Sequence, residues 1–74
     1  NPATTIAFAL PAASQVRLAV YDAMGREVAL LASGQYGAGS HRIEFAAAGL
    51  SSGLYFYKLT AAGRSWTKKM VLMQ

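Results

Sequence analysis

The stretch that decides the fold is a pair of runs near the C-terminus, Leu54-Tyr55-Phe56-Tyr57-Lys58-Leu59-Thr60 and Trp66-Thr67-Lys68-Lys69-Met70-Val71-Leu72-Met73, joined by Ala61-Ala62-Gly63-Arg64. Two apolar, aromatic-rich runs with a short glycine-containing link are typical of a β-hairpin. Lys58 marks the solvent side of the first run, so Tyr55, Tyr57 and Leu59 are predicted to face inward. The second run is apolar on both faces, and its register stays open.

Three segments upstream of this hairpin alternate between the two faces of a strand. Residues 5–10, 16–21 and 40–45 each place apolar side chains at every second position, the period of a half-buried strand. The tetrad Asp22-Ala23-Met24-Gly25 is predicted to be a turn. An Asp side chain accepts backbone N–H groups two residues on, and Gly is favoured at the fourth position of a type I turn.

The segment after this turn is ambiguous. In residues 26–31, Val28 and Leu30 share a face, yet Leu31 follows directly. A β-bulge would rotate Leu31 inward. A short helix over residues 23–32 is the alternative, since Ala, Met, Glu and Leu favour helix. The shortness of the run and Gly25 favour the strand. Residues 33–39 contain three glycines and are predicted to form a loop.

These six strands, or seven, predict an all-β antiparallel sandwich or small barrel, because the links are short and turn signals recur. A chain of 74 residues fits one domain with a thin core. Cysteine is absent, and from the residue pattern we expect neither a signal peptide nor a membrane-spanning segment within these residues. We expect a tail module of a larger protein, because Asn1-Pro2 reads as part of a linker.

Charge and titratable residues argue against an enzyme, a metal site or a cofactor site. The net charge is +4, and the basic residues are scattered apart from Lys68-Lys69, which favours a solvated surface over nucleic-acid binding. The one histidine, His41, lies on the apolar face of its strand. No nucleophile elbow accompanies it, and Glu27 and Glu44 both lie beside arginines. Too few ligands remain for zinc.

The aromatic residues leave a binding role open. Phe56 and Trp66 are the best candidates for exposed side chains that stack on sugars. The competing interpretation is that so small a core needs its aromatic residues inside. A carbohydrate-binding module of a secreted enzyme, or a structural spacer, is therefore the alternative to any recognition role.

The chain resembles the type A C-terminal sorting domains of the type IX secretion system, and is similar to the immunoglobulin-like domain of the flagellar hook-capping protein. Each matching piece is weak alone, but together they span the chain in order. The matching residues are Asn1-Pro2, Thr4-Thr5-Ile6, Phe8, Leu10-Pro11, Val16-x-Leu18-x-Val20-Tyr21-Asp22-x-x-Gly25-Arg26-Glu27-Val28, Gly39-x-His41, Leu50-x-x-Gly53-x-Tyr55-x-Tyr57-x-Leu59 and Lys69-Met70-Val71-Leu72. The opening lacks a second Asn-Pro, so we expect a shortened linker.

The resemblance implies an immunoglobulin-like β-sandwich behind a secreted cargo domain, such as a hydrolase or adhesin. It implies export through the periplasm and outer membrane to the cell surface or beyond. It also implies partners: the secretion machinery, a sortase-like peptidase that cleaves the domain, and anionic lipopolysaccharide. The recognition residues it implies are Gly53, Tyr55, Lys68, Lys69, Met70, Val71 and Leu72. A terminal strand that is apolar on both faces suits recognition by β-augmentation, and we expect Lys69, Met70 and Val71 to be read this way.

Overall fold

The computed structural model describes residues 3–73, and every regular element among them is a β-strand. The strands are β1 (Ala3–Leu10), β2 (Ser14–Asp22), β3 (Glu27–Tyr36), β4 (Gly39–Ala46), β5 (Gly53–Ala61) and β6 (Arg64–Leu72). The predicted all-β fold is confirmed, and the alternative helix over residues 23–32 is wrong. The linker expected at Asn1-Pro2 lies outside the described residues. No helix in residues 3–73 has the length and apolar character needed to cross a membrane.

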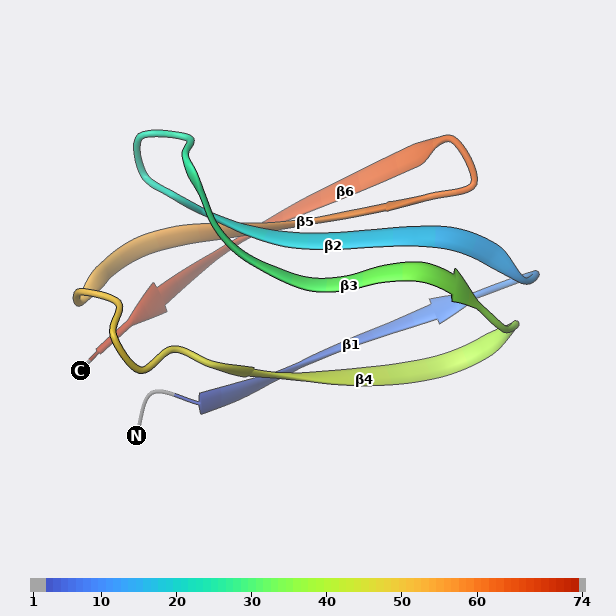
Figure 1. Ribbon diagram of the computed structural model, residues 1–74, viewed down its shortest axis with the longest axis horizontal. Helices are drawn as coiled ribbons and strands as arrows, with labels where there is room; N and C mark the ends of the chain where they lie inside the picture. The colour runs from blue at the N-terminus through green and yellow to red at the C-terminus, as the bar shows by residue number, and fades with distance from the viewer. Residues whose placement is uncertain (1–2, 74) are drawn as a thin grey trace.

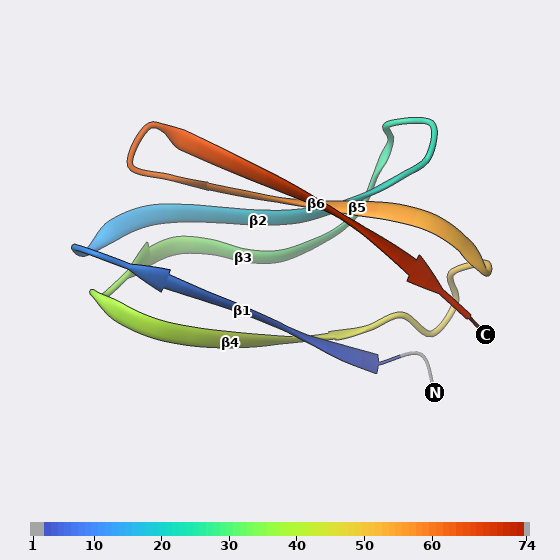
Figure 2. The same cartoon turned by 180° about the vertical axis from the view of Figure 1, so that it is seen from behind.

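The strands form two antiparallel sheets of unequal width. One sheet contains β1 and β4, and the other has the order β3-β2-β5-β6. The two sheets lie one above the other, with β3 and β4 nearest the viewer in Figure 1. Figure 2 shows the opposite side of the sandwich, where β6 and β1 are nearest. The predicted sandwich is therefore confirmed, with six strands in the described residues.

The core forms where the central strand β2 faces the small sheet. Val16, Leu18 and Val20 have the largest fully buried side chains in the described chain. Ile6 of β1 and Phe45 of β4 belong to the same buried cluster as Leu18 and Val20. Period-two alternation is confirmed in β1, β2 and β4, although Ala19, between Leu18 and Val20, is also buried.

The turn at residues 22–25 is also confirmed. The Gly25 N–H donates to the Asp22 carbonyl oxygen at 3.0 Å, and Asp22 Oδ1 accepts the Met24 N–H at 2.9 Å. Gly25 adopts a φ of 87°, in the left-handed region that glycine tolerates best. The carboxylate therefore satisfies turn donors that would otherwise need water, which is the reason that Asp at this position favours the turn.

Strand β3 differs from the prediction in two ways. Residues 33–36 belong to the strand, not to a loop, because Gly34 and its neighbours pair with β2, opposite Val16. Only residues 37–38 separate β3 from β4. The register shifts by one residue at Leu31, the predicted bulge, and again at Val28. Leu31 and Val28 pack against the core, whereas Leu30 is 50% exposed, so the prediction that Leu30 shares a face with Val28 is wrong.

The central role of β2 can be tested by shortening one leucine. Leu18→Ala should lower the free energy of unfolding by about 3 kcal/mol, since a buried leucine truncation loses its apolar transfer energy and leaves a cavity. A domain of this size holds roughly 3–5 kcal/mol, so this variant should be largely unfolded. Leu30→Ala makes the same chemical change at a half-exposed position and should cost about 0.5 kcal/mol or less. Urea unfolding followed by circular dichroism measures both, and equal losses would contradict this assignment of the core.

Candidate recognition surface

The β5–β6 hairpin brings the expected recognition residues together. Its two-residue link has φ values of 52° at Ala62 and 74° at Gly63, the signs that a type I′ turn requires. The pairing places Gly53 opposite Leu72, Leu54 opposite Val71 and Tyr55 opposite Met70. The register of β6, which its two apolar faces left open in the sequence, is set by this pairing. The two segments that the resemblance implied are thus neighbours in space.

Residues of β6 alternate between two surfaces with different environments. Met70 and Leu72 face the core and are half-buried and buried, whereas Val71 is 65% exposed on the outer face. Lys69 lies on the same outer face as Val71, while Lys68 lies on the inner face with Met70. The implied recognition residues of β6 therefore divide between its two faces.

The outer face carries an exposed apolar patch across both strands of the hairpin. Directly opposed residues of an antiparallel pair point to the same face, so Leu54 neighbours Val71 and Phe56 neighbours Lys69. Leu54 is 38% exposed and Phe56 is partly buried. We call Leu54, Phe56, Lys69 and Val71 the outer hairpin patch. The period-two pattern of β5 already pointed Leu54 outward, but only the pairing with β6 reveals the patch.

Tyr55 and Gly53 shape the entry into this hairpin. The Tyr55 hydroxyl donates to the Ser51 carbonyl oxygen at 2.8 Å, and the Leu50 N–H donates to the Ala47 carbonyl oxygen at 3.0 Å. Gly53 has a φ of 149° where β5 begins. A tyrosine that bonds back to the backbone just upstream of its strand is a recurrent clamp in immunoglobulin-like sandwiches, where the chain crosses between sheets. Both residues therefore support the surface from beneath.

The tyrosine clamp predicts a measurable loss of stability. Tyr55→Phe removes the hydroxyl and leaves the Ser51 carbonyl without this partner, which should lower the free energy of unfolding by about 1 kcal/mol. Tyr57→Phe is the matched control, because Tyr57 lies on the same face of the same strand and has no side-chain hydrogen bond within residues 3–73. Urea denaturation should separate the two variants, and a loss in Tyr57→Phe as large as in Tyr55→Phe would contradict the clamp.

Phe56 and Trp66, the two residues named for the carbohydrate-binding alternative, do not form one platform. Phe56 is on the outer face, where it lines a shallow hollow of about 310 Å³ with Tyr21, Lys58 and Thr67. Trp66 is on the inner face, is 47% exposed, and lines a different hollow with Tyr57 and Leu59. The expectation that Trp66 is exposed is confirmed, whereas Phe56 is only partly so. The sheet separates the two rings.

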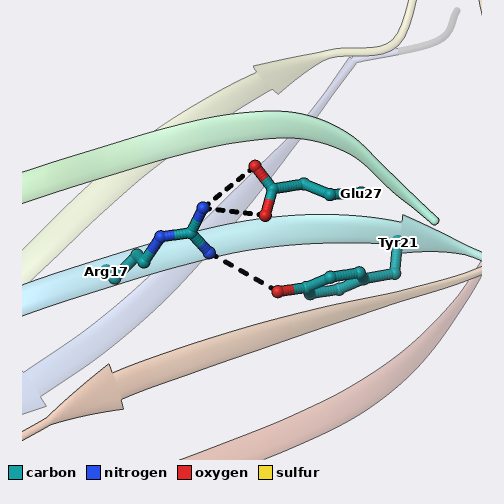
Figure 3. Close-up of polar contacts among 3 residues, drawn as sticks. All are labelled: Arg17, Tyr21 and Glu27. Atoms are coloured by element: carbon teal, nitrogen blue, oxygen red, sulfur yellow. Dashed lines mark hydrogen bonds and ion pairs between the residues drawn. The ribbon is translucent and has the colours of Figure 1, made fainter. Parts of the chain in front are cut away.

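The acidic groups of the large sheet are held in ion pairs. Figure 3 shows Arg17 of β2, whose Nη2 donates to Glu27 at 2.8 and 3.0 Å and whose Nη1 donates to the Tyr21 hydroxyl at 3.5 Å. The hydrogen bond to Glu27 is the main reason that the pKa of Arg17 is raised. Asp22 pairs with Arg26 at 2.9 Å, and the Arg26 N–H is the main reason that the pKa of Asp22 is lowered.

The single histidine is part of an aromatic cluster far from these acids. The His41 ring stacks on Phe8 at 5.3 Å and meets Tyr36 edge-on at 5.2 Å, and its Nε2 lies 2.7 Å from the Gly37 carbonyl oxygen that accepts from it. The β3–β4 link and the Asp22 turn lie at opposite ends of the sandwich (Figure 1). Sequence reasoning missed this cluster, because Tyr36 fell in a predicted loop. Within residues 3–73 no group of three or more metal-ligating side chains occurs.

Because the pKa of Asp22 is lowered in the folded chain, part of the folding stability depends on pH. Folding holds the carboxylate in its charged form, so its stabilisation is complete above the usual value of 3.8 and is lost as the pH falls through the lowered pKa. Asp22→Asn keeps a side-chain oxygen for the turn but removes the charge. The wild type should melt at a higher temperature than Asp22→Asn at pH 7. This difference should shrink once the pH drops below 3.8. A pH-independent difference in Tm would show that the charge is not its source.

Residues 3–73 form a β-sandwich without helices, in which Leu54, Trp66 and Val71 are exposed on the edge hairpin while Met24 and Leu30 are exposed elsewhere. An edge hairpin with exposed apolar residues suits a recognition module. The chain belongs to the family of secretion system C-terminal sorting domains, whose model matches residues 1–73. No curated protein and no solved structure gave a significant match. The resemblance to type IX sorting domains is thus confirmed. As a member of this family, the chain is a C-terminal sorting signal that interacts with the type IX machinery for export to the cell surface or secretion.

Proposed function

We propose that the type IX machinery reads this domain through the outer hairpin patch, with Val71 and Lys69 as its main contacts. The observation that carries the proposal is the exposure of Val71, an apolar residue that is 65% exposed on an edge strand and directly opposite exposed Leu54. Edge strands are normally protected by charge, twist or a covering element. An apolar patch kept open at such an edge is typical of a binding site for another protein.

The other expected residues act in support of this surface. Leu72 is buried and Met70 half-buried, so they anchor β6 to the core beneath the patch. Gly53 and Tyr55 position the start of β5, through the turn and through the hydrogen bond to Ser51. Lys68 faces the other side of the strand. The residues implied by the resemblance then serve two purposes. Val71 and Lys69 contact the secretion machinery, and others hold these two residues in position.

The cargo and its processing complete the proposal. The domain follows a larger cargo protein such as a hydrolase or adhesin, has no catalytic role of its own, and is removed by a sortase-like peptidase. The net charge of +4 favours contact with anionic lipopolysaccharide at the cell surface.

The ion pairs of Asp22 with Arg26 and of Glu27 with Arg17 support a structural role for these carboxylates.

Export of a full-length cargo protein tests the patch with single substitutions. Val71→Glu puts a charge into the apolar patch and should reduce secretion by about tenfold while leaving the Tm of the domain within a few degrees. Leu30→Glu is the control, because Leu30 is a comparably exposed residue on β3, the opposite edge of the same sheet. Its export should match the wild type. Secretion is measured by immunoblot of medium and cell fractions.

Point variants are needed because removing residues 70–74 would also remove the buried Leu72 and destabilise the fold. Normal export of the Val71→Glu protein would overturn the proposal. Export that survives deletion of the whole domain would favour a structural spacer. If polysaccharides quenched the fluorescence of Trp66 saturably while Val71→Glu left export intact, the carbohydrate-binding alternative would be preferred.

A further inference from the structure

The unequal widths of the two sheets leave the N-terminal part of the inner face of β6 uncovered. The large sheet has four strands and the small sheet has two. Leu18 and Val20 of β2, which face the small sheet, are fully buried. On the inner face of β6, by contrast, Trp66 is 47% exposed and Lys68 is also exposed. Figure 2 looks onto this side of the sandwich, where β6 and β1 run in opposite directions.

A continuous groove follows β1 and β6 along this side. Three hollows of about 400, 300 and 260 Å³ lie end to end. Ala9 and Trp66 line both the first and the second hollow, and Ile6 and Tyr57 line both the second and the third. Shared walls join them into one depression, which we call the β1–β6 groove. Apolar residues of β1 and β5, such as Ile6, Phe8 and Leu59, make up much of the lining of its central hollow.

One wall of the groove is an unpaired strand edge. Among the described strands β1 pairs only with β4, so its other edge, on the groove side, presents backbone N–H and C=O groups without a strand partner. A segment added along this edge would widen the small sheet to three strands. It would also cover the inner face of β6. An extended peptide matches both requirements, because it supplies backbone partners and side chains on one face.

The other wall is basic. Arg64, Lys68 and Lys69 each line one of the three hollows, and none of the described residues that line them is acidic. Along the inner face of β6 the side chains read Arg64, Trp66, Lys68 and Met70, a cation alternating with an apolar group. A complementary strand therefore carries, at every second position, a carboxylate and an apolar side chain in turn. A second copy of this chain fits poorly, since its β6 would set lysine against lysine.

We propose that the β1–β6 groove binds an extended acidic segment of a partner protein, about eight residues long, which adds as a strand to the free edge of β1. Carboxylates of this segment lie against Arg64 and Lys68, and apolar side chains between them contact Trp66 and Met70. The inference goes beyond the sorting role proposed above, because it rests on Trp66 and Lys68 of the inner face of β6. Lys69 and Val71 of the outer hairpin patch reach only the third hollow of the groove. Peptide binding and export are separate measurements, so either one can fail alone.

Trp66 is the only tryptophan in the chain and reports on the groove directly. The probe is a capped eight-residue peptide with glutamate at its first and fifth positions, valine at its third and seventh, and threonine between. We expect a saturable change in Trp66 fluorescence when the 74-residue chain is titrated with it. A peptide of the same composition, with one glutamate moved to the opposite face, should bind more weakly. So should a peptide with lysine in place of glutamate.

Charge reversal within the protein provides the matched pair of variants. Lys68→Glu should weaken peptide binding by about fivefold or more, because an attraction becomes a repulsion in a partly enclosed site. Lys58→Glu makes the same change on the outer face of β5, outside the groove, and should bind like the wild type. Equal weakening by both variants would overturn the proposal, since the effect would then be one of net charge.

Backbone methylation tests whether the peptide adds as a strand. Only alternate residues of an added strand point their N–H groups toward the β1 edge. Two peptides methylated on alternate amides, in opposite phases, should therefore differ: one binds and the other does not. Equal binding by both phases would overturn strand addition. Dimerisation of the chain that buries Trp66 as the protein concentration rises would also overturn the proposal. A third contrary result would be a change in Trp66 fluorescence that depends on Lys68 and is caused by an anionic polysaccharide but not by the peptide.

Discussion

The burial of one side of β2 against the two-stranded sheet is the constraint on which the rest of the fold depends. Leu18 and Val20 are fully buried and lie in a cluster with Ile6 and Phe45 from the opposite layer. Since the described residues contain no disulfide or metal cluster, this contact is the main source of cohesion between the sheets. Strands β3 and β5 are held by pairing with β2, and β6 by pairing with β5. Strand β6 lies two strands away from β2, so its attachment depends on β5 and on the buried Leu72.

This arrangement explains why one strand can present two different surfaces. Near its C-terminal end, β6 is fixed from below by Leu72 and Met70, and the pairing with β5 fixes its register. Near its N-terminal end the small sheet no longer reaches it, so Trp66 and Lys68 stay accessible. The outer face meets solvent along the whole strand. An edge strand attached to a stable core on one side only is well suited to recognition, because its exposed groups are already ordered before a partner arrives.

Much of this fold could be predicted from local pattern. The alternation in residues 5–10, 16–21 and 40–45, the Asp22 turn and the β5–β6 hairpin follow from side-chain period and turn chemistry, which act over a few residues. The extension of β3 through Gly34 could not, because its partner Val16 is distant in sequence and supplies the hydrogen bonds that glycine's weak propensity does not. Strand order is likewise set by long-range pairing. For the same reason the residues of the candidate surface could be named, but which face of β6 each of Lys68 and Lys69 occupies could not.

The position of β6 after all the other described strands has a consequence for biosynthesis. Both of its surfaces exist only when β6 has paired with β5, and β5 in turn with β2. During translation these residues leave the ribosome after every strand they depend on. A polypeptide interrupted before Arg64 therefore lacks both surfaces, even if the strands that precede Arg64 have been made. Because of this order of strands, both surfaces form only after synthesis has passed β6.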